Sequence, residues 1–278
     1  MTKFLKQFVF VALGVAILVV GGVLVFGVGD KGAAPVGWWK FDEGSGNYAY
    51  DSSSNRNTGS LYLGGSATSS AWVSGVYGTA LSFDGVDDYV SGSFTPSSLT
   101  DFSESFWIKT GNIIGSNTGF FTVYGTNLSA INCIITPNEY VTLYLVDAYV
   151  IFSGVNALSI GEWAHVVLTR SGSTISSYKN GVLVGTGTDA QVLGTLNSFV
   201  IGSEAPSGPR FTGSLDDVRI YNYARSADQI RADYNAGKAL YVGAKATDCD
   251  VSPADCVNKG LVGYWDMDQM GGQTATDK

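Results

Sequence analysis

The sequence predicts an all-β protein in which two antiparallel sheets stack into a sandwich, preceded by one transmembrane helix. Short segments in which apolar and polar residues alternate predict the sandwich, because a half-buried antiparallel strand has that period. The 36 glycines among 278 residues also suit many strands joined by tight turns. The predicted strands are Ala80–Phe83, Asp88–Ser91, Ser105–Lys109, Phe120–Tyr124, Ile131–Thr136, Val141–Val146, Glu162–Thr169, Thr174–Lys179, Val182–Gly185, Ser198–Gly202 and Ser214–Tyr221.

An uncharged apolar run near the N-terminus predicts the transmembrane helix. Lys3 and Lys6 precede residues 8–28, and a helix of that length is about 31 Å long, enough to cross a bilayer core. The run exceeds the apolar part of a cleaved signal, so we expect residues 1–30 to be an uncleaved signal-anchor with a cytoplasmic basic end. The alternative is a long signal cleaved after Ala34. Both place the chain beyond the spacer at 31–35 outside the cytoplasm.

The charge of the chain argues against nucleic acid as a partner. Its formal net charge is −8 and only 14% of its residues are charged, without a basic stripe. His165 is the single histidine, which excludes a His-rich metal site and argues against His-based acid–base catalysis. We expect His165 to be a strand residue that makes one hydrogen bond.

Local signals predict one hairpin turn and one short helix. Asn180 and Gly181 favour the positive φ angles of a type I′ turn. Ser226 and Gln229 have the spacing of a capping box at the start of a helix, and Gly237 is expected to end that helix.

A short internal repeat sets the expected domain boundaries. Residues 36–52 (VGWWKFDEGSGNYAYDS) and 262–278 (VGYWDMDQMGGQTATDK) align without gaps and share seven identities in seventeen positions. Ordinary residue usage would give roughly one. The offset of 226 residues has the size of a whole domain. We therefore expect one domain at 36–237, a linker at 238–260 and the first strand of a truncated second copy at 261–278.

The linker carries a predicted disulfide. Cys249 and Cys256 lie seven positions apart in an acidic loop. In an oxidising compartment they would close a small ring that stabilises the fold by about 2.5 kcal/mol. Cys133 lies in an apolar strand, and we expect it to be a buried small hydrophobe.

Five motifs follow one another in a fixed order across roughly residues 36–237. They are WWKFDEG at 38–44, ALSFDG at 80–85 with DDYV at 87–90, SFWIK at 105–109, EWAHVVLT at 162–169 with YKNG at 178–181, and GSLDDVRIY at 213–221. This ordered set resembles the laminin-G-like domain of the concanavalin A-like lectin/glucanase superfamily. The resemblance implies a two-sheet antiparallel jelly-roll sandwich. Tandem copies in one exported chain are common in that family, in agreement with the internal repeat.

The carboxylates do not predict a glycosidase. Hydrolases on this fold carry acids at alternate positions of one strand, where they face one cleft. Asp87 and Asp88 are adjacent, as are Asp216 and Asp217, and adjacent strand residues point to opposite faces. We therefore expect this chain not to be an enzyme.

The resemblance implies a structural calcium ion near the terminal strands, bound by carboxylate and backbone oxygens. By similarity to the glucanase relatives, Asp216 would supply a carboxylate, with Asp42 and the carbonyl group of Gly78 as further ligands. The alternative for Asp216 is a carboxylate that caps a turn or faces Arg219.

By similarity to the pentraxin relatives, a ligand site would instead use the loops near Asn127 and Glu204. The sequence departs from that pattern, because Ala205 and Pro206 follow where oxygen ligands would be needed.

Aromatic rings exposed on the concave sheet face could stack on sugar rings, and the candidates are Tyr124, Tyr140, Tyr144, Tyr149 and Trp163. The alternative is that these rings pack in the core. The predicted function is non-catalytic binding of a glycan or a cell-surface protein, by a membrane-anchored module in a tandem array. One alternative is a structural or adhesive surface protein that binds protein partners. Another is an accessory domain of an enzyme whose catalytic part lies outside this chain.

Overall fold

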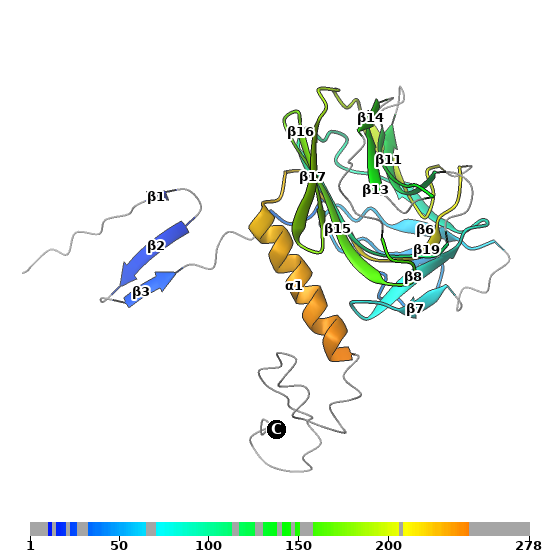
Figure 1. Ribbon diagram of the computed structural model, residues 1–278, viewed down its shortest axis with the longest axis horizontal. Coiled ribbons are helices and arrows are strands. Elements are labelled where there is room, and N and C mark those ends of the chain that lie inside the picture. The colour runs from blue at the N-terminus through cyan, green and yellow to red at the C-terminus, as the bar shows by residue number, and fades with distance from the viewer. Residues whose placement is uncertain are drawn as a thin grey trace, which may run out of the picture.

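The computed structural model describes residues 11–12, 15–20, 23–26, 33–64, 71–112, 117–125, 130–137, 141–145, 148–150, 158–205 and 208–244. Two eight-stranded sheets form the body of the fold, and every strand pairing within them is antiparallel (Figure 1). The predicted two-sheet sandwich is therefore confirmed.

The first sheet has the strand order β17-β16-β15-β10-β19-β8-β7. One edge of β19 pairs with β10, and its other edge pairs with β8 at one end and with β4 at the other. The strands are β4 (Gly37–Trp39), β7 (Trp72–Ser74), β8 (Thr79–Asp84), β10 (Phe102–Thr110), β15 (Trp163–Ser171), β16 (Thr174–Lys179), β17 (Val182–Thr188) and β19 (Thr212–Tyr221).

The second sheet has the strand order β14-β13-β12-β11-β18-β9-β6-β5. Its strands are β5 (Tyr48–Ala49), β6 (Gly59–Tyr62), β9 (Tyr89–Ser93), β11 (Thr118–Gly125), β12 (Ala130–Ile135), β13 (Val141–Leu145), β14 (Ala148–Val150) and β18 (Leu196–Ile201). Strands far apart in the chain are neighbours in both sheets, as in a jelly roll.

Large aromatic side chains fill the space between the sheets. The Trp39 and Phe199 rings lie 4.4 Å apart, and those of Phe106 and Phe120 lie 4.8 Å apart in an edge-to-face arrangement. In each pair one ring comes from each sheet, and all four side chains are buried. Burial of rings of this size dominates the stability of a sandwich core.

The predicted hairpin is confirmed, and the predicted helix is confirmed at its start. Asn180 and Gly181 have φ angles of 53° and 77°, and the turn joins β16 to β17. The helix α1 (Ala227–Ala244) begins after Ser226, whose backbone N–H donates to Gln229 Oε1 over 2.9 Å. The prediction that Gly237 ends the helix is wrong, because α1 continues through it.

The prediction of a helix over residues 8–28 is not confirmed. Within that run the structure has three strands, β1 (Val11–Ala12), β2 (Val15–Val20) and β3 (Val23–Phe26), and Val20 pairs with Val23. The run is rich in β-branched valine, which favours strands. In the described part of the chain no helix is both long enough and apolar enough to span a membrane.

Candidate functional site

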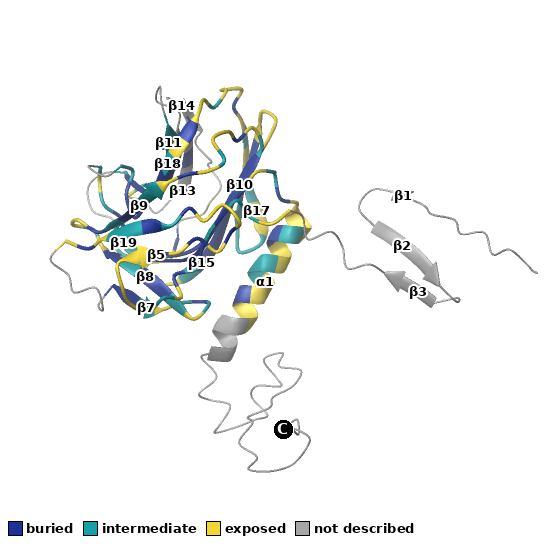
Figure 2. Ribbon diagram, turned by 180° about the vertical axis from the view of Figure 1, so that it is seen from behind, coloured by how far each residue is buried: buried dark blue, intermediate teal, exposed yellow. Residues whose placement is uncertain are grey.

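The helix α1 covers part of the outer face of the first sheet, the face turned away from the second sheet (Figures 1 and 2). The Tyr234 ring of α1 stacks on Trp107 of β10, with 5.9 Å between ring centroids. A Cβ atom at position 237 would overlap the Trp107 ring, so only glycine allows this close approach. Gly237 is therefore a packing residue, and a ligand cannot reach this part of the first sheet.

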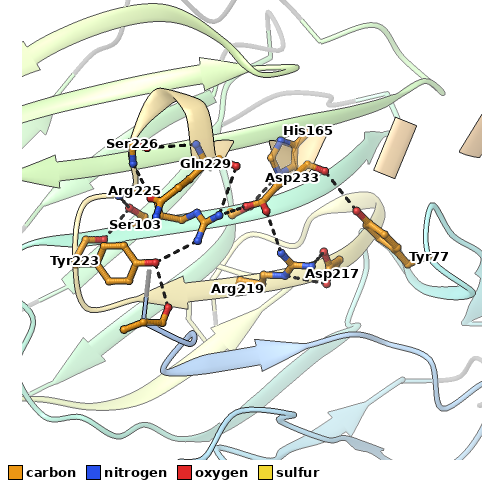
Figure 3. Close-up of polar contacts among 12 residues, drawn as sticks. Tyr77, Ser103, His165, Asp217, Arg219, Tyr223, Arg225, Ser226, Gln229 and Asp233 are labelled. Atoms are coloured by element: carbon orange, nitrogen blue, oxygen red, sulfur yellow. Dashed lines mark hydrogen bonds and ion pairs between the residues drawn. The ribbon is translucent and has the colours of Figure 1, made fainter. Parts of the chain in front are cut away.

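Figure 3 shows the polar network that fixes α1 to the first sheet. The Arg225 guanidinium lies 2.6 Å from the Asp233 carboxylate on α1, and Arg219 of β19 lies 2.6 Å from Asp217 and 4.0 Å from Asp233. The Tyr77 hydroxyl donates to the backbone carbonyl of Asp233 over 3.4 Å. These charges are mostly buried and paired, so the helix has one defined position on the sheet.

His165 lies beneath this helix. Its Nε2 atom is 2.9 Å from Ser105 Oγ, and the Tyr234 ring stacks above the imidazole. Burial, with the positive charges of Arg219 and Arg225, lowers the pKa of His165 to about 3. The imidazole is therefore neutral at physiological pH, and its side chain makes the single hydrogen bond that the sequence predicted.

Serine side chains line the part of the outer face of the second sheet that is formed by β6, β9 and the start of β18, whereas Val200, farther along β18, is buried on that same face. Strand alternation points the side chains of Leu61, Val90 and Phe199 into the core, so their neighbours along each strand point to the outer face. Ser60 of β6 pairs with Ser91 of β9, and Ser93 pairs with Ser198 of β18. These four serines are half-buried or exposed. We name this surface the serine face.

Tyrosine rings flank the serine face at one end. Tyr62 of β6 pairs with Tyr89 of β9, and their rings stack 4.5 Å apart at an interplanar angle of 6°. The Arg210 guanidinium lies 4.5 Å from the Tyr89 ring. Tyr62 is 47% exposed, and Tyr48 on the neighbouring edge strand β5 is 51% exposed. Exposed rings that gather on one surface mark a candidate binding site.

Three of the predicted ligand-binding residues, Tyr124, Tyr144 and Glu204, lie on or beside the same sheet. Tyr124 is half-buried on β11 and pairs with Ser198, at the opposite end of the serine face from Tyr62. Tyr144 on β13 is in register with Asn132 of β12. Glu204 follows β18 and packs against Gly119, where an added Cβ atom would lie 2.6 Å from Glu204 Cβ. Asn127 lies outside the described residues.

The three predicted calcium ligands converge at one end of the first sheet. Asp216 Oδ2 accepts hydrogen bonds from the backbone N–H groups of Val76 (2.7 Å) and Tyr77 (2.9 Å). Asp42 Oδ1 accepts from the Thr79 backbone over 3.1 Å, and a Cβ atom on Gly78 would overlap that same oxygen.

The second oxygen of Asp216, Oδ1, is buried and has no hydrogen-bond partner among the described residues. Burial, reinforced by the charges of Asp217 and Asp42, raises the pKa of Asp216 to about 8. The carboxyl group thus caps the turn after β7, as the alternative interpretation proposed, and it keeps one oxygen available for a cation.

The prediction that Asp216 and Asp217 point to opposite faces is wrong. The β10–β19 register shifts between Ser105 and Trp107, and Asp217 has a φ angle of 51°. This bulge interrupts the alternation of side chains between the two faces. Asp217 forms an ion pair with Arg219 and accepts a hydrogen bond of 2.6 Å from Trp38 Nε1. Asp217, and not Asp216, is the carboxylate paired with Arg219.

A group of three carboxylates lies next to the tyrosine pair, and sequence reasoning did not identify it. Asp84, Asp87 and Asp88 each place a carboxylate oxygen within 4.8 Å of the others. They occupy the turn between β8 and β9, so Asp88 directly precedes Tyr89. The sequence signal that could have identified this group is the spacing Asp-x-x-Asp-Asp in a short turn, because aspartate side chains in turns accept hydrogen bonds from the nearby backbone.

The core contains one polar pair that joins the two sheets. The Cys133 thiol on β12 donates to Glu104 Oε2 on β10 over 2.7 Å, and both side chains are fully buried. Burial raises the pKa of Glu104 to about 8, which makes this carboxyl group largely neutral. The expected burial of Cys133 is confirmed, whereas Cys249 and Cys256 lie outside the described residues.

Comparison with solved structures places the architecture among known sandwiches. Domain 4 of AbnA, an extracellular arabinanase from Geobacillus stearothermophilus whose structure contains arabinotriose, aligns with a TM-score of 0.59 and 22% identity, over 72% of this chain and 98% of that domain. The binding domain of botulinum neurotoxin serotype D aligns with a TM-score of 0.56 and 16% identity, over 73% of this chain and 50% of that one. At these identities the likeness establishes the fold.

Sequence comparison defines the family. The adhesion G-protein coupled receptor V1 of Danio rerio is 26% identical over 154 residues, which cover 50% of this chain and 2% of the receptor. The family model Laminin_G_3, described as the concanavalin A-like lectin/glucanases superfamily, matches residues 84–231. Because that match spans more than half of the chain, the protein belongs to the laminin-G-like family of this superfamily.

Proposed function

We propose that this protein is a non-catalytic module outside the cytoplasm that binds carbohydrate on the serine face. The observation that carries the proposal is the difference between the two outer faces. The first sheet is covered in part by α1 through Trp107 and Tyr234, whereas the second sheet presents half-buried or exposed serines, with the exposed Tyr62 at one end and the half-buried Tyr124 at the other. Sugars are recognised by the combination of ring stacking and hydrogen bonds to hydroxyl groups.

The spacing of the rings suits a short oligosaccharide. Tyr124 lies three strands from the exposed Tyr62 and is offset by four residues along the strand, because Tyr62 pairs with Tyr89 and Ser93 pairs with Ser198. With strands about 4.8 Å apart and a rise of about 3.3 Å per residue, the two tyrosines are about 20 Å apart. A chain of a few sugar units would span that distance and pass over the serine hydroxyls.

Relatives support a role in binding. The arabinanase domain was solved with arabinotriose, and the neurotoxin domain is a binding domain. The similarity to an adhesion receptor supports a place at the cell surface and favours a second candidate, recognition of a cell-surface protein. Attachment to the membrane through residues 1–30 and a tandem arrangement rest on the apolar run and on the repeat of residues 36–52 at 262–278.

We also propose that Asp216, Asp42 and the carbonyl oxygen of Gly78 hold a structural calcium ion. The site fits this ion because all its donors are oxygens and because Asp216 Oδ1 is buried without a partner among the described residues. A bound cation would keep Asp216 ionised and tie the β7–β8 turn to β19. Calcium would then support the fold and not contact the serine face directly.

The test is a glycan-array screen of the full chain in detergent micelles, with calcium and with a chelator. Binding to one sugar class should weaken about tenfold in Tyr62→Ala and in Tyr124→Ala, the equivalent of about 1.4 kcal/mol for one stacked ring. Tyr178→Ala is the matched control, since this half-buried tyrosine lies on β16 of the first sheet.

Three outcomes separate the proposals. Equal losses in all three variants would show that the serine face is not the binding surface. A blank array from folded protein would favour the protein-binding candidate. A chelator that leaves both the melting temperature and the binding unchanged would contradict the calcium proposal.

A further inference from the structure

The carboxylate group at the β8–β9 turn is built by the local backbone. Asp84 ends β8, and its Oδ1 atom accepts a hydrogen bond from the Val86 backbone over 2.8 Å. Asp88 Oδ2 accepts from the Asp84 backbone over 3.1 Å. The Asp87 carboxylate lies against Gly64 of the neighbouring loop, where an added Cβ atom would overlap both of its oxygens. The turn therefore brings three carboxyl groups together.

One buried oxygen of this group has no hydrogen-bond partner among the described residues. Asp88 is only 2% exposed, and its Oδ1 atom is buried with no partner among the described residues. A buried acceptor without a donor is costly, and the two neighbouring charges increase that cost. A bound cation would remove both penalties.

We propose that Asp84, Asp87 and Asp88 form a divalent-cation site suited to Ca²⁺, separate from the Asp216 site. Asp88 supplies a buried oxygen, and the exposed Asp84 and Asp87 supply oxygens from the solvent side. Carboxylates that leave room for water are the coordination that calcium accepts, because it takes 6–8 oxygen ligands in flexible geometry. The ion would lie beside Tyr89, the residue that follows Asp88.

This position gives the ion a spectroscopic signature, because a nearby aromatic ring transfers excitation to bound terbium. The test titrates Tb³⁺ into the full chain in detergent micelles and follows the terbium emission excited through tyrosine. All proteins carry Asp42→Asn, which removes an exposed ligand of the Asp216 site. We expect saturable emission that Ca²⁺ displaces. Adding Asp84→Asn and Asp87→Asn should weaken Tb³⁺ binding at least about tenfold, because two ligand charges are lost.

The matched control adds Asp228→Asn, which removes an exposed carboxylate of α1 and should leave Tb³⁺ affinity unchanged. Asp87→Asn alone is a milder variant that preserves the Asp84 and Asp88 bonds to the backbone, and it should also weaken binding. The proposal is overturned if the Asp42→Asn protein gives no saturable emission. It is equally overturned if binding survives in the Asp84 and Asp87 variants, or falls as much in the Asp228 control. None of these outcomes depends on whether the protein binds a glycan.

Discussion

The buried Glu104 makes the stability of the sandwich depend on pH. Its carboxyl group has a pKa of about 8 in the folded protein, raised by burial from an ordinary value of 4.5. Between these two values the unfolded chain loses the proton while the folded chain keeps it, so stability falls as pH rises. Between pH 5 and pH 9 the free energy of unfolding falls by about 4 kcal/mol, because each of the roughly three pH units from pH 5 to the folded pKa costs 1.36 kcal/mol. The total free energy of unfolding of a typical domain is about 5–15 kcal/mol.

The substitution Glu104→Gln removes this titration and keeps the size of the side chain. Guanidinium unfolding, followed by tryptophan fluorescence at pH 5 and pH 9, gives the free energy of unfolding of both proteins. We expect the wild-type protein to lose about 4 kcal/mol more than the variant between the two pH values. Asp216 also has a pKa of about 8, but it is present in both proteins, so its contribution cancels.

The matched control is Glu162→Gln, since Glu162 is exposed on the loop before β15. Its pH dependence should equal that of the wild-type protein. If Glu104→Gln also shows the wild-type pH dependence, Glu104 is ionised in the folded state and the argument from its burial fails.

Three further predictions concern α1 and the residues under it. Gly237→Ala should lower the free energy of unfolding by about 1–3 kcal/mol, because the new methyl group overlaps Trp107; an unchanged melting curve would show that α1 can shift. Arg225→Ala should lower the free energy of unfolding by about 1–3 kcal/mol, because the Asp233 carboxylate loses its 2.6 Å partner and keeps only Arg219 at 4.0 Å; chemical denaturation measures this loss. The imidazole NMR signals of His165 should not titrate between pH 5 and pH 8, and a midpoint near 6.5 would contradict its burial.

The strands could be predicted because their residues carry a local signal. Short runs rich in apolar residues identify β15 and β19, and the Asn180-Gly181 pair predicts one hairpin because its backbone angles are adopted by few residues. The short edge strand β5 gave no such signal, because a two-residue strand has no period to detect. The end of α1 was missed because Gly237 is a common helix terminator, and its contact with Trp107 is visible only in three dimensions.

The candidate sites were only partly predictable for the same physical reason. The resemblance identified Asp42 and Asp216, which the structure brings to one end of the first sheet. Strand alternation predicted the wrong face of the first sheet for the Asp217 side chain, because a single bulge shifts the alternation of side chains between the two faces. The Tyr62–Tyr89 stack depends on the pairing of β6 with β9, which are separated by more than twenty residues, and sequence periodicity does not reveal such register.

Both ends of the described sandwich attach to the same layer. The chain comes in at Ala33, whose carbonyl accepts a hydrogen bond from the Tyr223 hydroxyl over 3.1 Å, and proceeds to β4, which pairs with β19. It leaves through α1, which lies on that same sheet. Segments that precede or follow the sandwich are therefore connected at the first sheet. The serine face lies on the second sheet, so these connections do not cover it. A module connected in this way can be copied in series, or fixed to a surface, without losing access to its ligand.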